Sequence, residues 1–589
     1  MATKVISLNI KPGIQRDGTQ FDAPVYVDGR WVRFQRGRPR KVGGYRGIFQ
    51  NASGISRGMI SSSEDGLNYV YSGWRDGIQE WLTDNDNGVG SGPTNISLSN
   101  FTANDNNLWQ MDIGYDASGS GNQTVVAHPG LNLLNIDNTV NTPVLIGDFP
   151  TGAMSQVGVF TAAGTMVVGP PSVFTIASIN ALIAIGQTVS GTGITAGTTV
   201  TNVVIGSSTT DVSISTAAAT AGALTLTFNN NISVSGGCVM LHPYLFVYGN
   251  NGLIKNSSAG NFQDWVSADA NENTVSAGKI VKGMPVRGGT TSPSGIFWSL
   301  DSVIRVSYAP QTVGASSIYW RYDIVTSQSS ILSSSSVIEY DGIFYWCGVD
   351  RFLMYNGVVQ ELVNNMNTNH FFDNLNYAQR QKVWASKVPR WGEIWWFYPR
   401  GDSTECNDAV IYNVRDKVWY DAGEALGAKR SAGLFSEVFR KPIWAGNEEN
   451  DSGDYTLWQH ESGTDLVNLS LQTAIQSYFE TDSLGWVNGG PNQNDPIGMN
   501  NWIRLERVEP DFVQSGDMNL YVTGKGYATA EDVVTGPYTF SPTTLKIDLR
   551  EQRREMRLRF ESNVVNGNYE CGLNLLSADV GDVRSTGNP

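Results

Sequence analysis

The sequence predicts an all-β protein, and three observations support this fold class. The chain has 589 residues, of which only 16% are charged, whereas an ordinary soluble domain has roughly 25%. Small residues replace the missing charge, including 64 Gly, and aromatic residues make up 11%. Apolar and polar residues alternate with a period of two in many short segments, as in half-buried strands. Disorder of the whole chain is excluded, because it requires low hydrophobicity and dense charge.

Seven segment pairs share one pattern, in which two strands rich in Trp, Tyr and Val flank a turn with Asn, Asp or Gly. The pairs are 67–71 with 75–81, 123–127 with 130–134, 244–248 with 250–254, 296–299 with 302–306, 343–346 with 351–357, 393–398 with 409–414, and 442–445 with 456–459. Blades of a β-propeller need bulky apolar residues at alternate positions of their inner strands, because each blade packs on the next. The pattern predicts a β-propeller-like body. Since the spacing is irregular and no fixed-period signature recurs, a set of stacked β-sandwiches is the alternative.

A second region differs sharply in composition. Between Asp148 and Lys255 there is a single charged side chain, Asp211. Five segments there alternate apolar with small polar residues, namely 174–178, 187–190, 199–204, 211–215 and 223–228. We therefore expect residues 151–237 to form an inserted small β-sandwich, exposed as an appendage that extends from Thr151 to Gly237.

The remaining boundaries follow from charge and periodicity. Residues 1–58 are expected to form the basic N-terminal part of a β-rich platform, and residues 500–589 its C-terminal part, where Met556, Leu558 and Phe560 fall on one strand face. The propeller-like body would occupy residues 59–150 and 238–499. One helix is predicted over 373–388, capped by Asp373 or Asn374 and ended by Pro389.

Charge is unevenly spread along the chain, whose formal net charge is −15. Residues 1–57 contain 11 Lys and Arg against three Asp, which leaves −23 for the rest. The densest stretch holds Arg30, Arg33, Arg36, Arg38, Arg40 and Lys41. Because aromatic residues interleave with these cations, the stretch suits phosphate contacts and base stacking. It equally suits a protein interface in which the arginines pair with acidic neighbours. Nothing resembles a recognition helix or a zinc finger, so sequence-specific binding is not predicted.

Catalytic and metal sites find little support in the sequence. Cys238, Cys347, Cys406 and Cys571 are at least 59 residues apart and the four His are isolated, so buried free thiols are expected rather than zinc motifs. A glycosidase needs two carboxylates about 5–10 Å apart. The candidates Glu393, Glu405, Asp408 and Glu437 form no diagnostic pattern. We expect no catalytic residues, no cofactor and no metal site.

Neither a calcium loop nor a membrane span is predicted. The run 84–88 resembles the beginning of a calcium loop but lacks its later oxygen donors, so an ordinary turn is expected. The first ten residues lack the charged leader and apolar core of a signal peptide. No stretch of about 20 apolar residues is present, so no membrane span is expected.

Several of these segments together resemble the tail nozzle family of short-tailed bacteriophages, also called packaged-DNA stabilisation proteins. The resemblance rests on residues 286–289 with 296–305, 340–357, 393–399, 411–421, 37–45 and 549–560. It implies a homohexameric tube whose β-propeller-containing subunits dock through the platform beneath the adaptor of the head-to-tail connector. A tail fibre or tailspike would be a further partner. The implied function is that of a structural virion protein, made in the host cytoplasm, that retains the packaged genome and forms the conduit for DNA ejection.

The resemblance gives the uneven charge a meaning. The six cations of the N-terminal stretch become a candidate adaptor or subunit interface, whereas the acidic remainder would repel DNA phosphates and let the duplex slide without sequence-specific binding. Reversing Arg33, Arg36 and Arg38 to Glu is then expected to stop tail assembly. The alternative is a virion-associated propeller protein that binds a receptor or degrades glycans.

Overall fold

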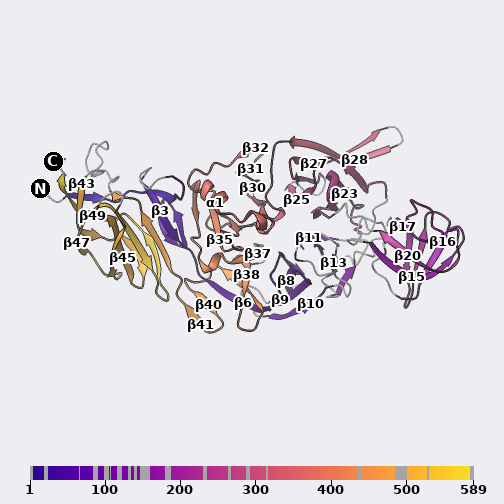
Figure 1. Cartoon of the computed structure of the whole chain (residues 1–589), viewed down its shortest axis with the longest axis horizontal. Helices are drawn as coiled ribbons and strands as arrows, with labels where there is room; N and C mark the ends of the chain where they lie inside the picture. Colours follow the sequence, from indigo (N-terminus) through magenta and orange to yellow (C-terminus); the bar gives the residue numbers. More distant parts are fainter. Residues whose placement is uncertain are drawn as a thin grey trace. The chain divides into compact units, whose positions relative to one another are not determined.

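A computed structural model describes most of the chain, in two units. The described residues are 4–18, 24–64, 67–83, 90–97, 105, 108–115, 123–129, 134–137, 142–145, 159–178, 183, 188–229, 235–262, 267–286, 292–313, 316–435, 439–484, 501–526 and 530–583. Unit 1 comprises Met1–Asn51, Asp350–Phe352 and Leu362–Pro589, and unit 2 comprises Ala52–Val349 and Leu353–Glu361. Strands dominate both units, and α1 (Thr368–Asn374) is the single α-helix in the described ranges (Figure 1). The predicted all-β class is confirmed.

Unit 2 contains five four-stranded antiparallel sheets in which each strand pairs with the next along the chain. The first two sheets are β7 (Gly58–Glu64), β8 (Leu67–Trp74), β9 (Gly77–Thr83) and β10 (Gly90–Asn95), then β11 (Gln110–Tyr115), β12 (Gln123–His128), β13 (Leu134–Asp137) and β14 (Thr142–Leu145). The third and fourth are β21 (Gly237–Leu241), β22 (Tyr244–Tyr248), β23 (Leu253–Asn256) and β24 (Asn271–Thr274), then β25 (Ile280–Val286), β26 (Ser294–Ser299), β27 (Val303–Val313) and β28 (Ser316–Thr326). The fifth is β29 (Ile338–Tyr340), β30 (Ile343–Cys347), β31 (Phe352–Tyr355) and β32 (Val359–Glu361), of which Phe352 belongs to unit 1. Short 3-10 turns, η4 (Asn250–Gly252) and η5 (Ser334–Ser336), interrupt the connections.

These five sheets pack face to face in chain order. The first strands of the first four, β7, β11, β21 and β25, lie side by side. Buried side chains fill the spaces between successive sheets: Tyr71 belongs to the cluster between the first and second, and Phe246 lies 5.9 Å from the Phe297 ring between the third and fourth. The Trp298 and Trp346 rings lie 5.7 Å apart between the fourth and fifth. Successive four-stranded sheets packed in this way are propeller-like.

Unit 1 contains two more sheets of this style. One is β33 (Trp384–Val388), β34 (Glu393–Tyr398), β35 (Asp408–Asn413) and β36 (Val418–Asp421). The other is formed by β37 (Arg430–Leu434), β38 (Ile443–Glu449) and β39 (Tyr455–His460), and a strand from the N-terminal segment, β6 (Tyr45–Ala52), pairs with β39 and supplies the fourth strand. Beyond β6 this sheet continues into β40 (Leu466–Asn468) and β41 (Leu471–Thr473). The Trp384 and Trp444 rings pack between the two sheets at 6.3 Å.

The predicted hairpins coincide with the centres of these seven sheets. Six of the seven segment pairs correspond to the second and third strands of one sheet, for example β8 with β9 and β34 with β35. In the pair 123–127 with 130–134, residues 130–133 lie outside the described residues and only Leu134 falls in β13. Their burial explains why they were recognisable, because every residue of β22 and of β34 is buried. The propeller-like prediction is confirmed at this level.

The two ends of the chain share the platform sheets of unit 1. The larger sheet has nine strands: β1 (Lys4–Ser7), β2 (Lys11–Ile14), β3 (Val25–Arg30), β42 (Ser477–Thr481), β43 (Asn501–Glu509), β45 (Met518–Lys525), β46 (Val533–Phe540), β47 (Ile547–Ser562) and β49 (Leu575–Val583). The smaller sheet pairs β4 (Val32–Gln35), β5 (Arg38–Lys41), β48 (Asn568–Cys571) and β44 (Phe512–Ser515). Their shared core includes Leu520, Phe560 and Tyr569. N-terminal residues after Lys41 leave these sheets, since β6 belongs to the β37–β39 sheet.

The inserted domain has its own sheet and core. It consists of β15 (Val159–Val167), β16 (Ser172–Ile176), β17 (Thr188–Ser190), β18 (Val200–Ile205), β19 (Thr210–Ile214) and β20 (Gly222–Asn229), in the order β17-β20-β15-β16-β19-β18 (Figure 1). A bridge between Thr188 and Thr199 links its two ends. The expected sandwich is therefore one continuous sheet folded around a core that includes Phe174, Leu226 and Phe228.

The helix predicted over 373–388 is wrong. The α-helix lies earlier, at α1, a 3-10 turn η6 (Tyr377–Lys382) follows, and β33 begins at Trp384. Trp384, Ser386 and Val388 are buried while the residues between them are not, which is the period of a strand. Trp384 stacks on Phe397 with ring centroids 4.3 Å apart. Packing against the neighbouring strand therefore overrides the helical pattern of the sequence.

Candidate functional site: charged side chains of the N-terminal segment

The structure separates the six cations predicted as an interface. Arg33 and Lys41 are 0% and 3% exposed, so neither contributes to a surface, and for these two residues the prediction is wrong. Lys41 donates to the Gly567 carbonyl at 2.8 Å, and burial lowers the pKa of its amine to about 8. Arg30 donates to Gln476 and to the Glu424 carbonyl. Both faces of β4 are covered, because Val32, Arg33 and Phe34 are all buried, and in β5 Pro39 and Lys41 are buried while Arg38 and Arg40 are half-buried.

Arg33 occupies the centre of a buried ionic network. Its guanidinium lies 3.0 Å from Glu393 Oε1 and donates two hydrogen bonds to Glu461. Glu393 also accepts hydrogen bonds from the Tyr420 hydroxyl at 2.6 Å and the Trp395 indole at 3.0 Å. Burial raises the pKa of Glu393, and the Arg33 charge opposes that shift. The Arg33 charge is buried and meets the carboxylates of Glu393 and Glu461, so the network is structural.

Arg40 and Arg390 stack on the Trp391 ring and Arg415 contacts the backbone beside it. Arg36 and Arg38 belong to the hairpin whose Gln35 contacts Trp391, and Arg38 donates to the Gly572 carbonyl. We call Trp391 with Arg36, Arg38, Arg40, Arg390 and Arg415 the Trp391 surface. The guanidinium carbons of Arg40 and Arg390 lie 4.8 Å and 5.1 Å from the Trp391 ring centroid. Arg415 donates to the carbonyls of Arg390 and Pro389 at 3.0 Å and 2.7 Å. Stacking on an aromatic face fixes an arginine while its donors stay available.

The β4–β5 hairpin brings the first three arginines to this place. Gln35 pairs with Arg38 and donates to the Trp391 carbonyl at 3.1 Å, which sets the hairpin tip beside Trp391. Arg36 and Gly37 form the tip with φ of 54° and 74°, as a two-residue hairpin turn requires. Arg36, Arg390 and Arg415 are exposed, whereas Arg38 and Arg40 are half-buried. Arg40 is paired with Glu570, so the surface as a whole stays positive.

Sequence reasoning missed Trp391, Arg390 and Arg415. They lie roughly 350 positions beyond the basic stretch; Gln35 and Trp391, for example, are 356 residues apart. The only local signal was the sequence Pro-Arg-Trp-Gly at 389–392 between two strands, which marks a turn rather than an interface.

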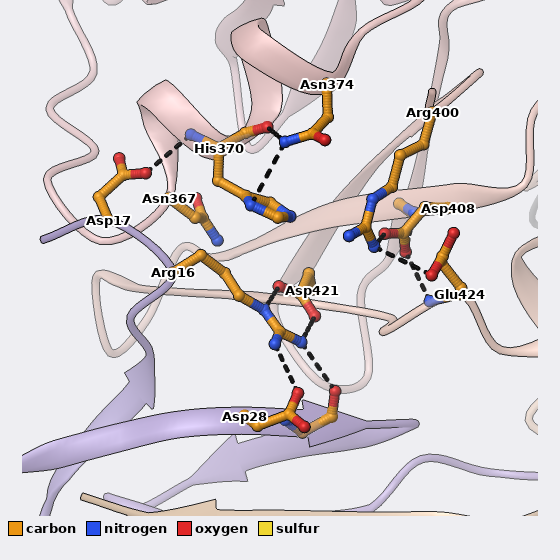
Figure 2. Close-up of polar contacts among 12 residues, drawn as sticks. Arg16, Asp17, Asp28, Asn367, His370, Asn374, Arg400, Asp408, Asp421 and Glu424 are labelled. Atoms are coloured by element: carbon orange, nitrogen blue, oxygen red, sulfur yellow. Dashed lines mark hydrogen bonds and ion pairs between the residues drawn. The ribbon is translucent and has the colours of Figure 1, made fainter. Parts of the chain in front are cut away.

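A second charged cluster joins the N-terminal segment to α1 and β36 (Figure 2). Arg16 lies between two carboxylates and donates to Asp28 at 2.5 Å and to Asp421 at 2.7 Å and 3.0 Å. Beside it, Asp408 accepts hydrogen bonds from Arg400 at 3.1 Å and from the backbone N–H groups of Ala409 and Glu424. The cluster therefore holds the loop between β2 and β3 against β36 through the Arg16–Asp421 ion pair.

Burial decides what this cluster can do chemically. Asp408 and Asp421 are 1% and 3% exposed. Burial, reinforced by the Asp421 charge, raises the pKa of Asp408 to about 6. A general acid with that pKa would suit hydrolysis, but glycoside hydrolysis needs both carboxylates at the substrate. Since neither side chain reaches solvent, the cluster is structural and stabilises the contact between the β2–β3 connection and β36.

Of the other carboxylates that are candidates for a glycosidase, the two that the structure describes are not placed as a catalytic pair. Glu393 is buried in the Arg33 network, and Glu405 is paired with Lys382 at 2.7 Å. Glu437 lies outside the described residues, as does the run 84–88.

Asp17 caps α1 from a distant part of the chain. Its carboxylate accepts a hydrogen bond from the backbone N–H group of His370 at 2.7 Å (Figure 2) and another from that of Asn369 at 2.8 Å. Asn367, at the N-cap position, makes no capping hydrogen bond with its own side chain. Asp17 thus satisfies two donors that the helix leaves unpaired.

Replacing Asp17 by Ala is expected to lower the free energy of unfolding by about 1 kcal/mol, the usual cost of losing a cap. Urea unfolding followed by tryptophan fluorescence measures the change. Asp416→Ala is the matched control, because Asp416 is exposed and far from α1 in sequence. Equal midpoints for the two variants would contradict the capping role.

The predicted ends of the appendage are not both on a surface. Thr151 lies outside the described residues. Gly237 is buried as the first residue of β21, and a Cβ there would meet the Gln110 side chain at 2.4 Å. The prediction that Gly237 is exposed is therefore wrong, and the described part of the inserted domain ends at β20.

No protein-family model matches the chain, and no curated protein is significantly similar to it. Within the described ranges, no helix has the length and apolar character needed to cross a membrane. Over the same ranges, no three His, Cys, Asp or Glu side chains converge as a metal site would require. All four cysteines are buried free thiols, which confirms that prediction.

Proposed function

We propose that the chain is a structural virion protein of the tail nozzle kind, which assembles as a hexamer below the connector adaptor, retains the packaged genome and conducts DNA during ejection. The observation that carries the proposal is where the resembling segments fall in the fold. Residues 296–305, 340–357, 393–399 and 411–421 contribute strands to the propeller-like sheets. Residues 37–45 and 549–560 contribute to the platform sheets through β5 and β47. The resemblance implies this same division.

Symmetry gives the first test. On this proposal the purified chain forms six-fold rings, which negative-stain microscopy would resolve. Monomers, or rings of another symmetry, would refute the hexamer. Turnover of host polysaccharide by the purified chain would instead favour the glycan-degrading alternative.

The Trp391 surface is the best candidate for docking to the adaptor. Ring stacking fixes Arg40 and Arg390, backbone contacts fix Arg415, and of the five arginines only Arg40 has a carboxylate partner in the described part of the chain. A positive surface on a chain of net charge −15 favours an acidic partner through electrostatic complementarity. This surface replaces the set that included Arg33 and Lys41, because reversing Arg33 would test folding instead of docking.

Reversing Arg36 and Arg390 to Glu is expected to reduce tail attachment to purified capsids at least about tenfold, since like charges across an interface are strongly unfavourable. Counting tailed particles by electron microscopy measures the effect. The control reverses two other exposed arginines, Arg321 and Arg351, and should assemble normally. Normal assembly of the Arg36→Glu, Arg390→Glu variant would exclude the Trp391 surface, whereas the six-fold ring tests the nozzle separately.

A further inference from the structure

A hollow of about 230 Å³ lies in unit 1 among β6, β38, β39 and β40. Its walls include the aromatic rings of Tyr45 and Trp458 and the polar groups of Arg430, Glu448 and Asn468. It is separate from the Trp391 surface and from the Arg16 cluster, and nothing in the proposed function uses it. Its size suits one small ring-shaped molecule and is below the usual range for drug-sized ligands.

Aromatic stacking fixes the apolar wall of the hollow. Tyr45 is buried, and the Trp458 ring meets it edge-on at 5.3 Å. The Arg430 guanidinium lies 4.8 Å from the Tyr45 ring and 5.2 Å from the Trp458 ring. Trp458 itself is half-buried. The indole is thus held in one position while part of it remains open to a ligand.

Two polar groups at the hollow have bonding capacity left over. Arg430 is 3% exposed; its Nε donates to His460 and its Nη1 to two carbonyls, and its guanidinium also interacts with the Tyr45 hydroxyl. Its Nη2 makes no hydrogen bond of good geometry among the described residues. Asn468 uses its oxygen to accept from Gln50, which leaves its amide N–H groups. Glu448 pairs with Lys429. A buried donor without an acceptor destabilises the folded chain unless another group completes it.

The balance of charge indicates the kind of ligand. The charged residues that line the hollow are Lys429, Arg430, Glu448 and Glu449, so positive and negative charges are equal in number. This balance favours an uncharged ligand over a cation or an anion. A sugar ring matches the remaining features, because it presents an apolar C–H face to an indole and hydroxyl groups that both donate and accept. We propose that the hollow binds one pyranose unit of a polysaccharide.

This inference does not depend on the nozzle function. It adds a glycan contact to the chain, whichever assembly the chain forms. A hexamer without sugar binding would leave the nozzle proposal intact, and sugar binding by a monomer would leave this proposal intact.

The test measures binding of simple methyl pyranosides to the intact chain by saturation-transfer NMR. The probes are the methyl glycosides of glucose, galactose, mannose and N-acetylglucosamine, offered singly. A ligand of this size in a shallow site should bind at least one of them with a Kd on the order of 1 mM. No saturation by any of the four at about tenfold that concentration would overturn the proposal.

Variants locate the binding. Asn468→Ala removes one donor and should weaken binding about fivefold, the effect of one hydrogen bond. Gly446→Val should abolish it, because a Cβ at Gly446 would meet Trp458 Nε1 at 2.9 Å and displace the ring. Asn273→Ala, at an exposed position of β24, is the matched control and should bind normally. Thermal melting checks that each variant is folded. Native-like binding by folded Asn468→Ala and Gly446→Val would place the sugar elsewhere and overturn the proposal.

Discussion

Replacing Arg33 by Met is expected to destabilise unit 1 by about 3–5 kcal/mol, because it leaves two carboxylates without their counter-charge. Glu393 is fully buried and Glu461 is half-buried, and both are held by the Arg33 guanidinium. The Tyr420 and Trp395 hydrogen bonds to Glu393 remain, but they are neutral donors and cannot replace a charge. Urea unfolding monitored by tryptophan fluorescence measures the loss.

Two further variants separate this effect from a general sensitivity of the hairpin. Arg36→Met lies on the same hairpin at an exposed position and should change the free energy of unfolding by no more than about 0.5 kcal/mol. Adding Glu393→Gln and Glu461→Gln to Arg33→Met should recover most of the loss, since removing a whole buried ionic group is far less costly than removing one partner. If Arg33→Met were as stable as Arg36→Met, the network would contribute nothing.

The Arg33 network also explains why the charge of residues 1–57 did not predict the charge of the surface that they form. Counting residues 1–57 suggested a strongly basic surface, but several of these cations meet acids from later in the chain. Arg16 meets Asp421, Arg33 meets Glu393 and Glu461, and Arg40 meets Glu570. Sequence gives the charge of a segment, whereas the charge of a surface depends on partners that only the fold brings together. The surface left over, around Trp391, includes two arginines that the basic stretch does not contain.

The propeller-like sheets were predictable in their centres and not at their edges. Inner strands such as β22 and β34 are buried along their whole length, so aromatic and branched residues mark them. Three of the outermost strands are different: β10, β24 and β32 carry mostly exposed residues and leave no apolar signal. The pairing of β6 with β39 was equally invisible, because the two strands are about 400 residues apart and no local pattern reports such a contact.

The hollow beside Trp458 could likewise be predicted from the sequence only in part. Its aromatic residues were recognised as strand residues, since Trp458 falls in the seventh predicted hairpin. Their second role depends on Arg430 and Asn468, which β37 and β40 bring to the same sheet as β39. Strand periodicity predicts that Trp458 packs in a sheet, and it cannot predict which polar groups a neighbouring strand places beside it.

Between pH 4 and pH 6 the chain should lose stability as the pH rises, by up to about 3 kcal/mol through Asp408 alone. The pKa of this carboxyl is about 6 in the folded chain, against an ordinary value of 3.8. Below pH 4 the group is protonated in both states, so its contribution is fully present. Between the two pKa values the folded chain binds the extra proton, and raising the pH removes it at the cost of a buried negative charge facing Asp421.

Asp408→Asn isolates this contribution, because the amide oxygen can still accept from Ala409 and Glu424 while the side chain carries no charge. The variant should lose the decline in unfolding free energy between pH 4.5 and pH 7 that native Asp408 causes. Asp350→Asn is the matched control: Asp350 is exposed beside Arg351, which lowers the pKa of its carboxyl, so its pH dependence runs in the opposite direction. Identical pH profiles for native chain and Asp408→Asn would show that the folded environment does not hold a proton on Asp408, and that the Arg400 charge offsets its burial.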